Sequence, residues 1–274
     1  MGTILDIDAT AFAASFAKTP FAVKHSLAEN PLLSVESIAE LADELPSDFV
    51  EHNKGDIPTV VGDAAVERVE ASPGEIARNV EKNRTWMVLK NIEQVPRFRQ
   101  LLDDCLDEVA PLVENREGGM NLREGYVFLS APNSKTPAHT DHEHNFLLQV
   151  RGTKGMNIGR FRDVLAEQLQ VERMFSGQRN MEQMPDDPTL YDLHPGDGVY
   201  VPPNAPHWVD NGPDVSVSLS ITFRTPVTER GAVVHSVNRR LRKLRISPRP
   251  PGQHLGTDKA KFALHRGFQT LNRR

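Results

Sequence analysis

Apolar side chains in the first part of the chain recur every three or four positions, which is the spacing of one face of an α-helix. This spacing predicts helices at residues 34–45, 73–82 and 95–113. Ser34 stands where it can cap the first helix, and Pro46 follows its end. The third helix carries the longest apolar stripe, formed by Phe98, Leu101, Leu102, Cys105, Val109, Leu112 and Val113. The N-terminal part of the chain is therefore predicted to be helical.

From residue 121 onward the pattern changes to short runs rich in Val, Ile, Leu and Phe, separated by Gly, Pro and Asn. These runs predict strands at residues 126–129, 144–150, 156–161, 198–201 and 215–223. One predicted helix, at residues 164–174, interrupts the series and is followed by a polar loop. Because short strands with turn residues between them are typical of all-β architectures, we predict an antiparallel sandwich or barrel.

After residue 225 the helical spacing returns. We predict two more helices at residues 232–244 and 258–271, the second with Thr257 as its N-cap. The predicted fold class is mainly β with flanking helices. The predicted regions are a helical N-terminal region packed on the core (1–120), a β core (121–225) with a helical insert at about 161–190, and helical C-terminal arms (226–274).

The chain of 274 residues is long enough to bury a core without disulfides. Its single cysteine, Cys105, lies within the apolar stripe, so we predict a buried thiol rather than a nucleophile. One cysteine forms no internal disulfide, which is typical of a reducing compartment. The N-terminus lacks the basic start and apolar run of a secretory signal, and no stretch of about 18 apolar residues is present. We therefore expect a cytoplasmic protein that does not span a membrane.

Charge is distributed unevenly along the chain. Residues 230–274 contain 12 Lys or Arg and one acidic residue, a net charge of +11, whereas the rest contains 20 basic and 36 acidic residues, a net charge of −16. A basic tail on an acidic body favours self-association. The alternative is a nucleic-acid patch at residues 239–249, which is disfavoured because no aromatic residues are interleaved with the basic ones.

Two candidate metal ligands, His139 and Asp141, are separated by one residue. In an extended strand alternate side chains point to the same side, so these two groups share a face. An imidazole and a carboxylate suit a non-haem Fe(II) ion, and a second histidine would complete the ligand set. His207, after a Pro-rich turn at residues 202–206, offers that histidine. Two His and one Asp leave three positions of the ion open for a cosubstrate and oxygen.

The strand predicted at residues 215–223 has one apolar face and one face of small polar residues. The polar positions are Ser216, Ser218, Ser220, Thr222 and Arg224. A solvent-exposed strand face usually carries charged residues, whereas hydroxyl groups suit the wall of a polar pocket. A solvated face is the alternative interpretation.

Two sequence blocks carry a family resemblance. In TPAHTDHEHNFLLQVRGTKG a Thr-Pro-Ala precedes the first ligand, an Asn opens the next strand, and a turn of the form Q-[IV]-[KR]-G-x-K follows. The second block, HPGDGVYVPPNAPHWV, ends on the distal histidine. Both resemble the JmjC, or cupin-like, Fe(II)- and 2-oxoglutarate-dependent oxygenases, especially the hypoxia-inducible-factor asparaginyl hydroxylase type. The resemblance covers residues 125–224 and implies a double-stranded β-helix, or jelly-roll, core.

The resemblance assigns the iron ligands to His139, Asp141 and His207. It implies that Lys154 pairs with the distal carboxylate of 2-oxoglutarate and that Thr136 donates a hydrogen bond to the same group, which suits a buried carboxylate. Further positions that match residues near the cosubstrate are Asn145, Thr222 and, loosely, Tyr126. The sequence departs from the family at Gly155, where many relatives have Arg.

The resemblance implies that 2-oxoglutarate is decarboxylated to succinate while a C–H bond of the substrate is hydroxylated. It also implies a homodimer formed through the C-terminal arms. The sequence does not choose between a small metabolite and a peptide or protein side chain as substrate. A non-catalytic cupin-like sensor or regulator is the competing hypothesis. His142 and His144 form the H-x-H of the wider cupin superfamily, but the Glu that should follow is absent, so we expect them to line a pocket or the surface.

Overall fold

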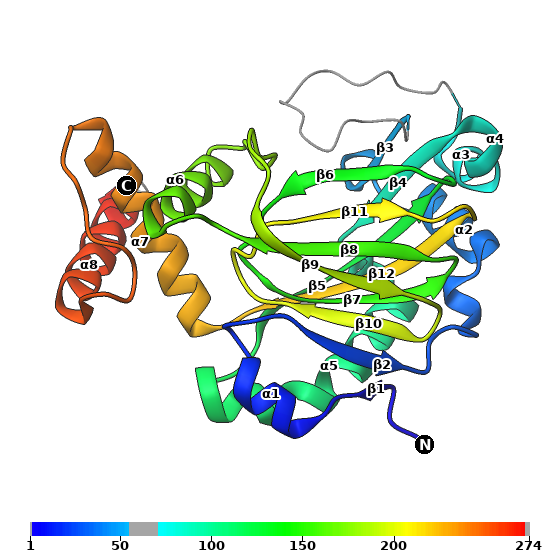
Figure 1. The fold of residues 1–274 in the computed structure, drawn as a ribbon, viewed down its shortest axis with the longest axis horizontal. Coiled ribbons are helices and arrows are strands. Elements are labelled where there is room, and N and C mark those ends of the chain that lie inside the picture. Colours follow the sequence, from blue (N-terminus) through cyan, green and yellow to red (C-terminus); the bar gives the residue numbers. More distant parts are fainter. Residues whose placement is uncertain (1, 55–70, 272–274) are drawn as a thin grey trace.

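The computed structural model describes residues 2–54 and 71–271. Two antiparallel sheets form its centre (Figure 1). The larger sheet has eight strands in the order β1-β2-β10-β7-β12-β5-β4-β3, and the smaller has four in the order β6-β11-β8-β9. The larger sheet contains β1 (Leu5–Asp6), β2 (Phe21–His25), β3 (Val50–Lys54), β4 (Thr85–Lys90), β5 (Asn121–Ser130), β7 (His144–Arg151), β10 (Asp197–Val201) and β12 (Ser216–Arg224). The smaller sheet contains β6 (Lys135–His139), β8 (Lys154–Arg160), β9 (Asp186–Leu193) and β11 (His207–Asn211).

Strands β5 to β12 form a double-stranded β-helix. Along the chain they pass repeatedly from one sheet to the other, with β5, β7, β10 and β12 in the larger sheet and β6, β8, β9 and β11 in the smaller. All pairings among these strands are antiparallel. The predicted fold class, mainly β with a jelly-roll core, is confirmed.

Strand β12 has one apolar face and one polar face, and both are buried. One face is apolar and packs in the main hydrophobic core with residues of the helices behind the larger sheet, through Val217, Leu219, Ile221 and Phe223. The opposite face is polar and equally buried, and is formed by Ser216, Ser218, Ser220 and Thr222. The second face therefore belongs to an interior wall, and the alternative of a solvated face is wrong.

The helices that precede the jelly roll cover the outer face of the larger sheet (Figure 1). They are α1 (Ala9–Ser15), α2 (Val35–Glu44), α3 (Pro73–Arg78), α4 (Val80–Asn83) and α5 (Pro96–Glu117), with short 3-10 turns at Pro31–Leu33, Ser47–Phe49 and Ile92–Gln94. The helices predicted near residues 34–45 and 95–113 are confirmed, and the one near 73–82 is two short helices. Ser34 caps α2, since its Oγ accepts a hydrogen bond from the Ser37 amide at 3.2 Å. Cys105 is buried, as predicted.

The region predicted as helical, residues 1–120, also contains four strands that were not predicted, β1 to β4. Strand β2 pairs with β10 and β4 pairs with β5, so the region extends the larger sheet on both sides. In β2 the buried residues Phe21, Val23 and His25 alternate with exposed ones. An alternation over five residues is too short to be separated from a loop by pattern alone.

Helices α6 (Val164–Met174), α7 (Pro226–Lys243) and α8 (Leu255–Leu271) gather at one side of the jelly roll (Figure 1, left). Helix α6 is confirmed, but the predicted insert ends early, because residues 186–190 already belong to β9. The N-cap prediction for α8 is wrong. That helix begins at Leu255, and Nδ1 of His254 accepts the Thr257 amide hydrogen at 3.2 Å. Within the described residues, no helix has the length and apolar character needed to cross a bilayer.

Candidate metal and cosubstrate site

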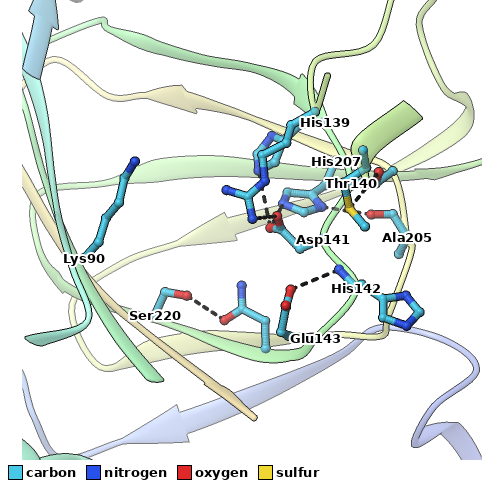
Figure 2. Close-up of polar contacts among 12 residues, drawn as sticks. Lys90, His139, Thr140, Asp141, His142, Glu143, Ala205, His207 and Ser220 are labelled. Atoms are coloured by element: carbon cyan, nitrogen blue, oxygen red, sulfur yellow. Dashed lines mark hydrogen bonds and ion pairs between the residues drawn. The ribbon is translucent and has the colours of Figure 1, made fainter. Parts of the chain in front are cut away.

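The three predicted metal ligands meet between the two sheets. His139 ends β6, Asp141 follows two residues later, and His207 begins β11, which pairs with β6 so that the two histidines are direct partners. Oδ2 of Asp141 lies 3.5 Å from Nε2 of His139 and 3.7 Å from Nε2 of His207. Figure 2 shows the three side chains pointing toward one another. In the part of the chain that the structure describes, this is the one group of three such residues close enough to hold an ion.

Backbone carbonyls fix both imidazoles for metal binding. Nδ1 of His139 donates to the Pro137 carbonyl at 2.8 Å, and Nδ1 of His207 donates to the Ala205 carbonyl at 2.9 Å. A proton on Nδ1 leaves the lone pair of each neutral ring on Nε2, which is the atom that faces Asp141. The donor set is therefore two neutral nitrogens and one carboxylate oxygen, which suits Fe(II).

The electrostatics of Asp141 and His207 favour the same protonation states. For His139, burial would lower the pKa, but the adjacent Asp141 carboxylate outweighs it and raises that pKa. Burial alone would raise the pKa of Asp141, but the neighbouring His139 and Arg179 outweigh it and hold that pKa well below its usual range. Burial, together with the nearby His139 ring, lowers the pKa of His207 to about 4. At neutral pH Asp141 is thus ionised and His207 is uncharged.

His142 and His144 stand apart from the metal ligands. His142 is buried and lies within hydrogen-bond distance of Oδ1 of Asn204 and the Thr228 carbonyl, at 2.8 Å each. His144 is fully buried, with its ring stacked between Phe16 and Phe223. Neither belongs to the three-residue group. Both are packed inside the protein, so the expectation of pocket or surface positions is wrong for His144, which lies in the main core.

The cosubstrate residues expected on the smaller sheet share a face with the metal ligands. In β11, His207, Val209 and Asn211 alternate onto one side. Val209 pairs with Thr136, and Asn211 pairs with Lys154. Thr136 and Lys154 therefore line the same inner surface as the two histidines.

Lys154 is a buried cation without a counter-charge. The residue is 3% exposed, and none of the ion pairs among the described residues includes its ammonium. Burial lowers the pKa of Lys154 to about 7. A site of this kind is incomplete, because a buried charge is normally paired, and a carboxylate from a ligand would supply the missing partner.

The residues expected on the larger sheet form the facing wall. Thr222 pairs with Asn145, and Ser220 pairs with Tyr126. The Ser220 hydroxyl donates to Oδ1 of Asn145 at 2.8 Å, while the Thr222 hydroxyl donates to the Glu124 carbonyl at 3.2 Å. Burial, reinforced by nearby carboxylates, raises the pKa of Tyr126, which keeps its hydroxyl protonated. These four residues share the inner face of the larger sheet, opposite the metal ligands.

Two further donors were missed at the sequence level. Trp86 and Ser130 are direct partners on β4 and β5, and Ser130 also pairs with Ser216 of the polar face. Within the described chain, Nε1 of Trp86 and Oγ of Ser130 are buried without a hydrogen-bond partner, as is Oδ1 of Asn211 opposite Lys154. Buried donors normally have acceptors, so the Trp86 N–H and the Ser130 hydroxyl fit a carboxylate such as that of 2-oxoglutarate, whereas the Asn211 oxygen is an acceptor. The pairing register identifies them, because no sequence motif surrounds either residue.

Comparisons with known proteins agree with this geometry. A family model described as JmjC domain matches residues 84–230, which is more than half of the chain. Two Escherichia coli structures share the fold. YcfD is 15% identical, with a TM-score of 0.55 over 97% of this chain and 68% of that chain. The complex of YcfD, a ribosomal oxygenase, with cobalt and 2-oxoglutarate is 15% identical, with a TM-score of 0.53 over 97% and 67%. No curated protein sequence matches significantly. From the extent of the domain match, this chain belongs to the JmjC domain family.

Proposed function

We propose that this protein is an Fe(II)- and 2-oxoglutarate-dependent oxygenase that hydroxylates a C–H bond. The observation that carries the proposal is the presence of two complementary features between the same two sheets. One is the group formed by His139, Asp141 and His207, with both imidazole lone pairs directed inward. The other is the buried ammonium of Lys154, which has no counter-charge. A metal ion suits the first feature and a dicarboxylate suits the second.

Each residue then has a distinct role. His139, Asp141 and His207 hold Fe(II), and the carbonyls of Pro137 and Ala205 orient the two rings. When bound together, iron, 2-oxoglutarate and O₂ would supply the oxidative chemistry: 2-oxoglutarate is decarboxylated to succinate and CO₂, and one oxygen atom of O₂ is inserted into the substrate C–H bond.

The remaining residues hold the cosubstrate. Lys154 and Thr136 anchor its distal carboxylate, with Trp86 and Ser130 as additional donors. The hydroxyls and amide of Ser220, Thr222 and Asn145 give the wall above it a polar surface, with Tyr126 alongside. Apolar residues below the site exclude water, which strengthens each of these interactions; they include Leu147, Met156, Val199 and Val209.

The proposed substrate is a small molecule or a peptide or protein side chain. The structurally similar YcfD is described as a ribosomal oxygenase, which supports a protein substrate. The single cysteine, buried and unpaired, supports a reducing compartment such as the cytoplasm.

We also propose a homodimer formed through α7 and α8. Residues 230–274 carry a net charge of +11 against −16 on the remainder, so these helices attract the body of a second copy. Large apolar side chains are exposed in the same region, namely Leu244, Ile246, Leu255 and Leu264. Such side chains are expected at a contact between protein chains.

Ligand-dependent stability tests the enzymatic proposal. A ligand that binds only the native state raises stability by RT ln(1 + [L]/Kd), about 2.7 kcal/mol at a hundredfold excess over Kd. We expect Mn(II) with 2-oxoglutarate to raise the melting temperature of the wild type and to have no effect on His139→Ala. An unchanged wild-type melting curve at saturating ligand would contradict the proposal. Succinate formation in the presence of Fe(II) and O₂ separates an oxygenase from a sensor, which would bind both ligands without turnover.

A further inference from the structure

The two carboxylate oxygens of Asp141 have different partners. Oδ2 faces the imidazole nitrogens of His139 and His207, at 3.5 and 3.7 Å. Oδ1 lies 3.3 Å from a guanidinium nitrogen of Arg179. One oxygen is thus directed at the proposed metal position, while the other is engaged by a cation.

Arg179 is held in place from two sides. On one side, the segment that carries it runs along β6. Asn180 forms a β-bridge with His139, and the Met181 amide donates to the Ala138 carbonyl at 2.7 Å. On the other side, the side-chain amide of Gln170, on α6, donates to the Arg179 carbonyl at 3.0 Å. The backbone of Arg179 is therefore fixed relative to the strand that bears the first metal ligand.

The other carboxylates around Arg179 have cations of their own. Glu143 pairs with Arg224 at 2.6 Å, and Glu51 pairs with Lys90 at 2.5 Å. Asp141 is the first cause of the raised pKa of Arg179, ahead of burial, which acts in the opposite direction. Asp141 is therefore the main electrostatic partner of Arg179, although the Arg179 side chain is 55% exposed, and Arg179 lowers the pKa of Asp141 next after His139.

We propose that Arg179 is a positioning residue that restricts Asp141 to metal binding through a single oxygen. The inference rests on the proposed function. Fe(II) held by one atom of each of the three side chains would keep positions for other ligands, and 2-oxoglutarate would occupy two of them as a chelate. If Oδ1 also bound the ion, one of those positions would be lost. By holding Oδ1 away from the ion, Arg179 keeps that coordination position available to the cosubstrate.

Substitution of Arg179 should separate the binding of the metal from that of the cosubstrate. In Arg179→Ala the carboxylate is free to bind with both oxygens and no cation opposes the ion, so we expect Mn(II) to bind at least as tightly as in the wild type. The Kd of 2-oxoglutarate for the Mn(II)-loaded protein should rise about tenfold, the lower end of the effect of residues that orient metal ligands. Arg179→Lys keeps a cationic donor of similar reach and should restore most of the affinity. Calorimetric titrations measure both constants without turnover.

The matched control is Arg162→Ala. Arg162 precedes α6 in the same inserted segment, is exposed, and pairs only with the adjacent Asp163 among the described residues. Its loss should change neither constant. The proposal is overturned if Arg179→Ala binds 2-oxoglutarate within twofold of the wild type, or if it loses Mn(II) binding in parallel. A wild type that binds neither Mn(II) nor 2-oxoglutarate would instead refute the proposed function itself.

Discussion

Replacement of Lys154 by alanine gives the sharpest test of the cosubstrate site. Lys154 is 3% exposed and has no charged partner among the described residues, so the bound carboxylate would complete a buried ion pair. Removing one partner of such a pair costs about 3–5 kcal/mol, which is more than a hundredfold in affinity. We therefore expect Lys154→Ala to bind metal nearly as the wild type does and to lose 2-oxoglutarate binding. Lys154→Arg should restore only part of it, because a planar guanidinium does not replace a compact ammonium.

The pH dependence of the same titration adds a second signature. With the pKa of Lys154 lowered to about 7 by burial, the ligand-free protein loses the ammonium above that pH. A carboxylate binds to the protonated form, so the Kd of 2-oxoglutarate should rise about tenfold per pH unit above pH 7. Whatever affinity remains in Lys154→Ala should lack this dependence.

The affinity for 2-oxoglutarate falls as the pH rises above 7, whereas the free energy of unfolding of the ligand-free protein should increase with pH. The pKa of Lys154 is lower in the folded state than the ordinary value of 10.5, so the unfolded chain binds the extra proton between about pH 7 and 10.5. Stability consequently rises with pH across that window, and the cost of burying the charge is fully present below pH 7. Lys154→Met removes this cost and should stabilise the apo protein by roughly 3–5 kcal/mol at pH 6, with the difference vanishing toward pH 10.5. Urea unfolding at several pH values measures it.

Lys135→Ala provides the matched control for both experiments. Lys135 lies on β6 of the same sheet, is exposed, and pairs with Asp210 at 3.3 Å. Its removal should alter neither 2-oxoglutarate binding nor the pH dependence of stability. If Lys154→Ala binds 2-oxoglutarate as tightly as the wild type, Lys154 has a structural role and the cosubstrate site lies elsewhere.

Three further outcomes are expected. Trp86→Phe keeps the ring but removes the unpartnered N–H, and should weaken 2-oxoglutarate binding by about 1.5–3 kcal/mol in calorimetry; unchanged affinity would exclude this donor from the site. Truncation after Thr228 removes nearly all of α7 and the whole of α8, and should convert a dimer to monomers or aggregates in light scattering. A full-length protein that is monomeric at micromolar concentration would refute the dimer and favour the nucleic-acid interpretation. Phe223→Ala truncates a fully buried ring and should cost about 3–5 kcal/mol in urea unfolding, and a loss below 1 kcal/mol would contradict its placement in the core.

The parts of the fold that the sequence predicted are those with long or repeated patterns. The stripe from Phe98 to Val113 spans several helical turns, and α5 is found there. Strand β12 alternates over nine residues, and both of its faces are buried as the pattern indicated. Strands β2 and β4 were missed because each has only five or six residues and gains its stability from pairing with β10 and β5, which lie far along the chain. Such pairing is not encoded locally.

The same distinction between local patterns and long-range pairing applies to the residues of the site. The grouping of His139, Asp141 and His207 could be predicted because metal ligands must be of particular types, and the spacing of these residues is a sequence motif. Trp86, Ser130 and Arg179 lack such a motif, since each reaches the site through the register of its strand or the path of its loop. Arg179 stands 38 residues after Asp141 in sequence, yet it lies beside that carboxylate because Asn180 pairs with His139.

The inserted segment between β8 and β9 therefore does more than lengthen a connection. It returns along β6 and places a cation against a metal ligand, while its helix α6 is fixed in turn by α7 through the pair of Arg242 with Glu172 at 3.1 Å. The C-terminal helices are thus joined to the proposed metal site by a continuous series of contacts, from Arg242 through α6 to Gln170 and Arg179. Continuity alone does not establish energetic coupling. A double-mutant cycle between Arg242→Ala and Arg179→Ala, with the Kd of 2-oxoglutarate as the readout, would measure it. If the arm acts through Arg179, the loss caused by Arg242→Ala should disappear in the Arg179→Ala background, whereas additive losses would mean that the two act independently.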